Sequence, residues 1–186
     1  MDSTSMLYQD VESELLVTKE KIAERVRELG RQIARDYEGR DLVVVSILKG
    51  SVLFFSDLIR EIDMPLTIDF MQASSYGNAA QSSGFVHIKK DLDRDIEGKD
   101  VLLVEDIVDS GRTLAYLKTM LKERGANSIR VATLLDKPEG RQVEMEADYV
   151  GFIIPNAFVV GYGLDYAEKY RNIPEIGILR PRVYQG

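Results

Sequence analysis

Three closely spaced carboxylates, Glu105, Asp106 and Asp109, are the residues of this chain best suited to chemistry. They follow the apolar run 101–104, which is typical of a buried strand in a parallel sheet. Carboxylates can accept hydrogen bonds from sugar hydroxyls or hold a hard cation through oxygen. Because like charges in one site repel one another, such a cluster indicates a ligand rather than a contribution to stability.

A turn of small and hydroxylated residues, Ser110-Gly111-Arg112-Thr113, comes directly after the carboxylates and opens an amphipathic helix. Backbone N–H groups at such a helix start can hold a phosphate, and the Ser110 and Thr113 hydroxyls add further donors. Taken singly, each of these residues is also common at strand ends and helix caps. Together with the carboxylates, the turn predicts a site for a phosphorylated ligand that is rich in hydroxyls.

Other phosphate-binding motifs are absent from the sequence. No Gly-x-x-x-x-Gly-Lys-Ser/Thr loop occurs, and no Gly-x-Gly-x-x-Gly follows the first predicted strands. The three-residue spacing from Asp106 to Asp109 also differs from the Asp-x-Asp spacing of a phosphatase nucleophile. These absences argue against a nucleoside triphosphatase, a dinucleotide-binding enzyme and an aspartate-based phosphatase.

The elements that must position these residues are strands and helices that alternate along the chain. Apolar runs predict strands at 42–48, 66–73, 85–89, 101–104, 128–136, 149–154 and 158–161. Helical periodicity and capping residues predict helices at 18–39, 52–62 and 111–124. This alternation predicts a single α/β domain with a parallel sheet.

Ligands of parallel sheets bind beyond the carboxyl ends of the strands. The segment Lys49-Gly50, the pair Glu105-Asp106 and Lys137 all stand where a predicted strand ends. We therefore expect them to meet at one edge of the sheet.

Composition limits the classes of function that remain. The 186 residues suit one domain with a real core, and the net charge of −7 argues against a general nucleic-acid surface. No apolar run is long enough to span a membrane, and the first residues lack the features of a signal peptide. Because the chain contains no cysteine, we expect a cytoplasmic protein without disulfides.

The stretch 101–114 resembles the phosphoribosyl-diphosphate-binding motif of type I phosphoribosyltransferases. In that motif two acidic residues follow a hydrophobic strand and precede Asp-Ser/Thr-Gly-x-Thr. Further segments resemble the hypoxanthine-guanine members of this family, and the likeness extends from about Leu16 to Leu179. These segments are Leu48-Lys49-Gly50, Ser75-Tyr76, Lys137-Pro138, and 158–166 followed by Arg171. Ser51 departs from the pattern, because many relatives carry a second glycine there.

The resemblance implies the type I phosphoribosyltransferase fold, a mainly parallel twisted α/β sheet flanked by helices. Residues 1–186 would form one domain, with a core over about 16–155. A small base-binding hood would consist of the N-terminal segment and about 156–186. Relatives form dimers and tetramers, so the resemblance implies a homodimer or a homotetramer.

The implied reaction transfers the 5-phosphoribosyl group of 5-phosphoribosyl 1-diphosphate to N9 of hypoxanthine or guanine. The products are IMP or GMP and diphosphate, as in purine salvage, and the cofactor is Mg²⁺. The partners are then small molecules, with neither nucleic acid nor membrane. Asp109 is the implied general base, facing N7 of the purine, although it could instead serve only as a helix cap.

The resemblance assigns the remaining site residues by position. It implies a sugar-diphosphate site made of Lys49, Gly50, Glu105, Asp106, Asp109, Ser110, Gly111, Arg112, Thr113 and Arg171. The implied metal ligands are Glu105, Asp106 and Asp165, and the peptide bond before Lys49 can be cis in this family. Because neighbouring strand residues point to opposite faces, Glu105 and Asp106 can serve one site only if the strand is irregular there.

The implied base-binding residues are Lys137, Phe158, Val159 and Asp165. Lys137 would donate to the 6-oxo group, Phe158 would stack on the purine, and the carbonyls of Val159 and Asp165 would accept from a 2-amino group. Ser75 and Tyr76 would belong to a lid over 74–84 that excludes water. The only histidine, His87, is expected to be structural.

Three alternatives remain open from the sequence. A transferase for another base, such as orotate, adenine or xanthine, is disfavoured by Lys137 and Phe158 together, although xanthine stays possible. A non-catalytic regulator could bind the sugar diphosphate as a signal, but it would also need a nucleic-acid surface. A purely structural α/β domain would leave the carboxylate cluster unexplained.

Overall fold

The computed structural model describes residues 6–75 and 86–185. Its first half contains η1 (Met6–Tyr8), β1 (Val11–Val17), α1 (Lys19–Asp36), β2 (Leu42–Ile47), α2 (Val52–Glu61), β3 (Thr67–Ser75) and β4 (Val86–Lys90). The second half contains β5 (Asp100–Val108), α3 (Arg112–Glu123), β6 (Ser128–Asp136), η2 (Pro138–Gly140), β7 (Tyr149–Ile153), β8 (Val159–Val160), β9 (Ile176–Leu179) and α4 (Pro181–Tyr184). No helix within these residues is long and apolar enough to cross a membrane.

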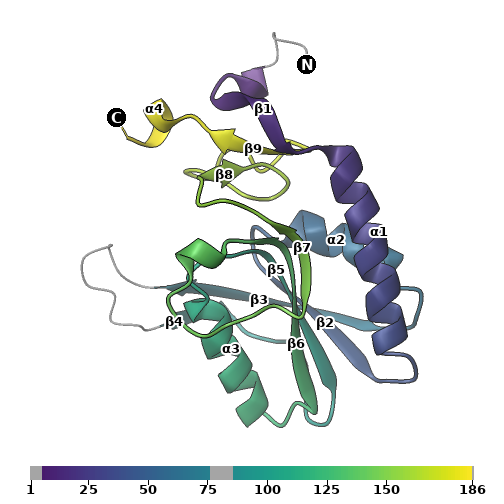
Figure 1. Cartoon of the computed structure of the whole chain (residues 1–186). Coiled ribbons are helices and arrows are strands. Elements are labelled where there is room, and N and C mark those ends of the chain that lie inside the picture. Colours follow the sequence, from purple (N-terminus) through teal and green to yellow (C-terminus); the bar gives the residue numbers. More distant parts are fainter. Residues whose placement is uncertain (1–5, 76–85, 186) are drawn as a thin grey trace.

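The main sheet has six strands in the order β4-β3-β2-β5-β6-β7 (Figure 1). All neighbouring pairs are parallel except β3 and β4, which are antiparallel. The prediction of a mainly parallel α/β sheet flanked by helices is therefore confirmed. The carboxyl ends of β2, β5 and β6 lie side by side, because β5 pairs with both of the other strands.

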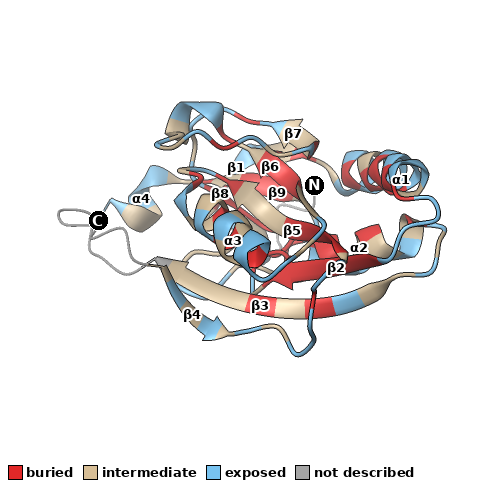
Figure 2. Ribbon diagram, turned by 90° about the horizontal axis from the view of Figure 1, so that it is seen from below, coloured by how far each residue is buried: buried red, intermediate tan, exposed pale blue. Residues whose placement is uncertain are grey.

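Hydrophobic packing on both faces of the sheet holds this arrangement. The central strands β2 and β5 are the most buried, as Figure 2 shows. Helices α1 and α2 pack on one face, where Leu29, Phe54 and Leu58 are fully buried. Helix α3 packs on the other face through Leu117 and Leu121.

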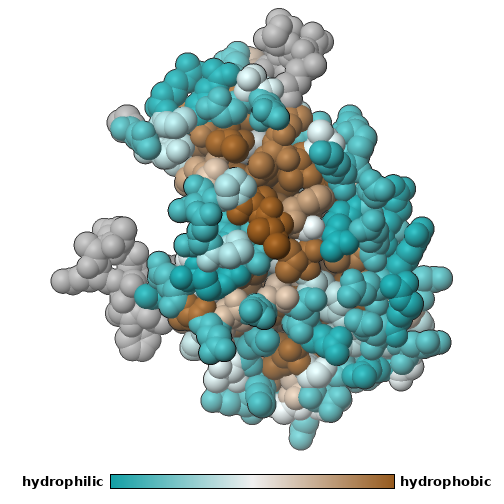
Figure 3. Space-filling model, viewed as in Figure 1, coloured by the Kyte–Doolittle hydropathy of each residue, from teal (hydrophilic) through white to brown (hydrophobic). Residues whose placement is uncertain are grey.

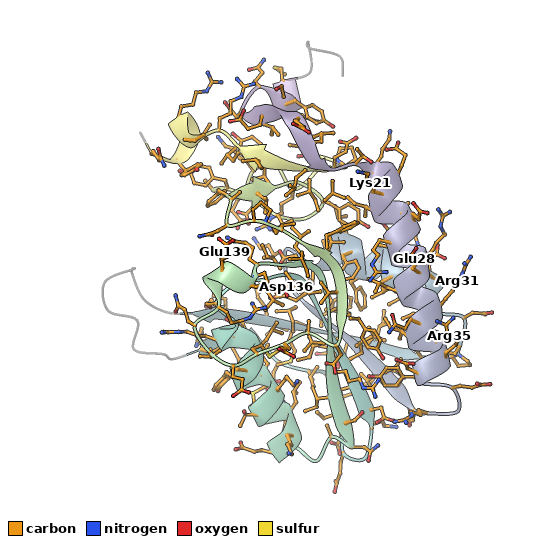
Figure 4. The ribbon with its side chains drawn as sticks, viewed as in Figure 1. Lys21, Glu28, Arg31, Arg35, Asp136 and Glu139 are labelled. Carbon is orange, nitrogen blue, oxygen red and sulfur yellow. The ribbon has the colours of Figure 1, made fainter. Side chains whose placement is uncertain are left out.

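Helix α1 illustrates how sequence pattern leads to packing. Its N-cap is Thr18, whose side chain accepts a hydrogen bond from the backbone N–H of Lys21. Four aliphatic side chains of the helix face the core: Ile22, Val26, Leu29 and Ile33. Charged side chains, among them Lys21, Glu28, Arg31 and Arg35, project along its outer face (Figure 4).

A second sheet of three strands, in the order β1-β9-β8, stands above the carboxyl ends of the main sheet (Figure 1). Its neighbouring strands pair antiparallel, so the two ends of the chain meet in one layer. Val11, Val160, Ile173 and Leu179 form its small core. We call this layer, with the loop 161–175 between β8 and β9, the upper layer.

Figure 3 shows apolar residues gathered along the middle of one face, over β7 and the upper layer. Ile153 at the end of β7 is 74% exposed.

Because β7 is an edge strand, its outer backbone groups need partners from elsewhere. The guanidinium of Arg25 on α1 donates to the carbonyls of Val150 (2.9 Å) and Gly151 (3.1 Å).

Candidate active site

Strand β5 carries the carboxylate pair within its regular part rather than after its end. Its pairing with β6 continues in register at Glu105, Ile107 and Val108. The alternation of the strand therefore persists, and the two carboxylates leave it on opposite sides. The structure does not show the irregular strand that a single shared site for both would require.

Glu105 lies on the side of the predicted phosphate site. It lines a pocket of about 140 Å³ together with Ile107, Val108, Asp109, Ser110, Gly111, Thr113 and Leu114. Asp106 instead lies against the loop after β2, where a Cβ atom on Gly50 would come within 1.6 Å of its carboxylate. Gly50 is thus required by the carboxylate of Asp106, a reason that the sequence alone does not provide.

Both carboxylates have strongly perturbed proton affinities. Burial raises the pKa of Glu105 well above its ordinary value, and the charge of Asp106 raises it further. Burial raises the pKa of Asp106 to about 6, although the backbone N–H of Ile107 and the charge of Arg171 act in the opposite direction. A carboxylate pair that is costly to ionise is suited to binding a cation or hydroxyl donors.

The turn after β5 leads into α3 through Gly111, which is the N-cap in the left-handed conformation (φ 79°). Asp109 is therefore not the N-cap of this helix, and no side-chain cap is present. The Ser110 hydroxyl accepts a weak hydrogen bond from the Arg112 N–H at 3.4 Å, and Thr113 lines the pocket beside Glu105. The Arg112 side chain is exposed. The start of this 12-residue helix faces the pocket, as an anion site requires.

Asp109 and Lys137 form an ion pair in which Nζ and Oδ2 lie 3.1 Å apart. The Lys137 side chain is only 11% exposed, whereas that of Asp109 is 51% exposed. The backbone N–H of Lys137 also donates to the carbonyl of Val108 at 2.9 Å. The loops after β5 and β6 thus bring the predicted base and the predicted purine-reading cation into direct contact.

The loop after β2 provides the second cation of the site. Its Leu48–Lys49 peptide bond is cis, as the family resemblance implied. The Lys49 ammonium group is exposed and lies 2.8 Å from the carboxylate of Glu168. A Cβ on Gly163 would lie 2.0 Å from the Gly50 carbonyl, so the upper layer rests directly on this loop.

Arg171 joins the same cluster from the upper layer. It pairs with Asp165 at 2.9 Å and with Glu168 at 3.2 Å, and donates to the Gly163 carbonyl at 2.8 Å. Ala167, Glu168 and Tyr170 all have positive φ, a conformation that non-glycine residues rarely adopt. The sequence analysis did not identify Glu168. No local pattern could have done so, because the loop conformation alone brings its carboxylate to Lys49 and Arg171.

Phe158, directly before β8, provides an exposed aromatic face. Its side chain is 39% exposed, stacks on Tyr184 with ring centroids 5.1 Å apart, and meets the edge of Tyr166 at 5.6 Å. Val159 is buried in β8 opposite Ile178. Tyr184, which the sequence analysis did not single out, comes from the C-terminal helix α4.

The lid prediction falls largely outside the described residues. Ser75 ends β3, where its backbone pairs with Val86, and Tyr76 and the segment 76–85 are not described. His87 is exposed on β4, opposite Ser74.

Within residues 6–75 and 86–185, no three acidic or histidine side chains converge as a metal cage. Magnesium sites for phosphorylated substrates commonly use one or two carboxylates, substrate oxygens and water. Asp106 and Asp165 act on each other electrostatically, and Asp165 raises the pKa of Asp106. This carboxylate set suits an ion that is completed by substrate.

Comparisons with known proteins show what this chain is similar to. Residues 13–167 match the model of the phosphoribosyl transferase domain. The chain is 51% identical over 180 residues to the hypoxanthine-guanine phosphoribosyltransferase of Bacillus subtilis, covering 97% of this chain and 99% of that protein. A crystal structure of a hypoxanthine phosphoribosyltransferase from Staphylococcus aureus, 51% identical, matches 100% of both chains with a TM-score of 0.95.

A longer relative is also similar. The bifunctional protein TilS/HprT of Listeria monocytogenes is 55% identical over 178 residues, or 96% of this chain. The chain spans 27% of the length of that relative.

Proposed function

The chain belongs to the phosphoribosyl transferase domain family, and we propose that it transfers the 5-phosphoribosyl group of 5-phosphoribosyl 1-diphosphate to N9 of hypoxanthine or guanine. The products are IMP or GMP and diphosphate, which makes the protein a pentosyltransferase of purine salvage. The observation that carries the choice of purine is the contact between Asp109 and Lys137, made beside the predicted phosphate turn.

This pair matches one edge of a 6-oxopurine. N7 and O6 are neighbouring polar atoms on that edge. Lys137 donates to O6, while Asp109 accepts the proton of N7 as N9 attacks C1 of the ribose. A 6-amino purine presents a donor where Lys137 also presents a donor, so adenine is rejected at a cost of ~1–3 kcal/mol. Phe158 supplies the stacking face, and the carbonyls of Val159 and Asp165 accept from the 2-amino group of guanine.

The sugar diphosphate is held along the edge of the sheet. Backbone N–H groups at 110–113 and the hydroxyls of Ser110 and Thr113 bind the 5-phosphate. Lys49 and Arg171 neutralise the diphosphate as it leaves. In this structure the carboxylate of Glu168 forms ion pairs with both Lys49 and Arg171, so the diphosphate must displace it.

Mg²⁺ would be held by Asp106 and Asp165, with Glu105 turned toward the ribose hydroxyls and the small pocket. When bound, the ion supplies positive charge that neutralises the diphosphate. The chain's own part is to keep Asp106 buried and both carboxylates near Arg171. The homodimeric or homotetrameric state and the cytoplasmic location remain predictions.

A diphosphate-release assay tests the proposal. The protein is mixed with 5-phosphoribosyl 1-diphosphate and magnesium, and hypoxanthine, guanine, xanthine or adenine is added in turn. Turnover with hypoxanthine and guanine and not with adenine supports the proposal. Turnover with xanthine as well would add a substrate and leave the proposed reaction unchanged. Tight binding of the sugar diphosphate without turnover on any base would point to the regulator instead.

A further inference from the structure

The segment after β6 touches the predicted base in more ways than through Lys137. Arg141 is 17% exposed, and its guanidinium lies across the turn that carries Asp109. Its Nη1 donates to the carbonyl of Val108 at 3.0 Å and to the carbonyl of Asp109 at 2.7 Å. Its Nη2 forms an ion pair with Asp136, the last residue of β6.

The arginine is itself held firmly. Asp136 is 14% exposed, so this ion pair is largely removed from solvent and its geometry is well defined. The Arg141 side chain also packs on the turn, because a Cβ on Gly111 would lie 3.1 Å from its Cδ. Figure 4 labels Asp136 at the end of β6 and Glu139 in η2, on the stretch that leads to Arg141. One guanidinium thus locks the end of β6 to the peptide group of Asp109.

Gly140 restrains the carboxylate of Asp109 directly. A Cβ at Gly140 would come within 1.8 Å of Oδ1 of Asp109, while Oδ2 pairs with Lys137. One carboxylate oxygen therefore packs on a glycine and the other faces a buried cation. The backbone of Gly140 does not have the positive φ found at Gly111. Alanine would fit its backbone and would conflict with the carboxylate alone.

We propose that Arg141 and Gly140 are positioning residues for Asp109: Arg141 fixes its peptide group, and Gly140 leaves the space in which its carboxylate points at the purine. Neither residue touches the reacting atoms. This inference rests on the proposed function, in which Asp109 is the general base. A displacement of about 1 Å in a reacting group can cost 10²-fold in rate, so the positioning has measurable consequences.

The test is a double-mutant cycle on the single-turnover rate of nucleotide formation, which removes product release from the measurement. Arg141→Met and Gly140→Ala are each expected to lower this rate about 10- to 100-fold. The Kd for 5-phosphoribosyl 1-diphosphate should change less than about two-fold, because neither residue lies among the groups assigned to it. Arg124→Met, which breaks an ion pair with Asp91 elsewhere, is the matched control and should keep the wild-type rate.

The decisive comparison repeats both substitutions in an Asp109→Asn background. If they act through Asp109, they should lower the already reduced rate by less than about two-fold. Equal losses in both backgrounds would show a general structural role and overturn the inference. Arg141→Lys, which keeps the charge opposite Asp136, should recover part of the rate. Should Arg141→Met fail to fold, Gly140→Ala compared in the wild-type and Asp109→Asn backgrounds decides the question.

The failure of this inference is distinct from the failure of the proposed function. A wild-type protein that forms no nucleotide with any purine would overturn both. A wild-type protein that forms nucleotide, with Gly140→Ala and Arg141→Met as fast as the wild type, would overturn only the positioning of Asp109.

Discussion

Replacing Asp106 with asparagine should make the protein more stable and less active. The carboxylate of Asp106 is desolvated against Gly50, and its pKa is raised from 3.8 to about 6. Asparagine has the same shape and carries no charge, so it removes the cost of a buried anion without a new clash. The same substitution removes a ligand proposed for the metal.

The pKa shift sets the size of the effect. About two pKa units at 1.36 kcal/mol each give an upper limit of about 3 kcal/mol at neutral pH. Because the side chain is partly accessible to solvent, we expect about 1–2 kcal/mol. For a chain of this size, each kcal/mol changes Tm by ~2–4 °C, so the variant should melt about 2 to 8 °C higher at pH 8.

The pH dependence gives the sign of the effect. A folded pKa above the unfolded value means that the wild type loses stability as the pH rises from 3.8 to about 6. The variant lacks this term, so its advantage should vanish below that window and grow across it. Melting curves from pH 3.5 to 8 in metal-free buffer measure this difference.

Two further arms sharpen the experiment. Asp63→Asn removes one exposed carboxylate just after α2 and should leave Tm within about 1–2 °C. Magnesium with 5-phosphoribosyl 1-diphosphate should raise the Tm of the wild type more than that of the variant, because ligand binding stabilises the folded state. An Asp106→Asn protein that melts at or below the wild-type temperature at pH 8 would refute the reasoning.

Three other substitutions have clear expected outcomes. Asp109→Asn should lower the single-turnover rate ~10²-fold or more while the Kd of the sugar diphosphate changes little; an unchanged rate would remove it as the base. Lys137→Ala should reduce the preference for hypoxanthine over adenine about 5- to 150-fold in kcat/KM, and an unchanged preference would place recognition of the 6-position elsewhere. Glu168→Gln removes the anion that pairs with Lys49 and Arg171, so KM for the sugar diphosphate should fall about two- to five-fold at low salt. A KM that rises would contradict the idea that Glu168 competes with the diphosphate for these two cations.

Local sequence was sufficient for the central strand, turn and helix of the site. The apolar run before Glu105 and the small residues at 110–113 lie next to one another in the chain, so their structure depends mainly on local preferences. The alternation of strands and helices likewise predicted the parallel sheet. The family resemblance added Phe158 and Arg171, which no local pattern distinguishes from ordinary core or surface residues. It also gave Lys137, already expected at this edge from the end of its strand, a role toward the purine.

Local sequence was less informative for the upper layer. Strand β9 has only four residues and pairs with β1 at the opposite end of the chain. Such short strands form because a distant partner is available, and their own propensity is weak. The antiparallel β4 and the extension of β5 to Val108 are further results of pairing with neighbouring strands.

The sequence by itself determined which chemistry this chain can support: carboxylates and a phosphate turn at one sheet edge, with cations from other loops. Only the tertiary structure decided which side of the sheet each of these groups faces and which residues it contacts. Because β5 stays regular, Glu105 and Asp106 point to opposite sides of the strand. The segment after β6 brings Gly140 and Arg141 into contact with Asp109. The physical reason is that contacts between segments far apart in the chain depend on strand order and loop conformation, which residue types alone do not specify.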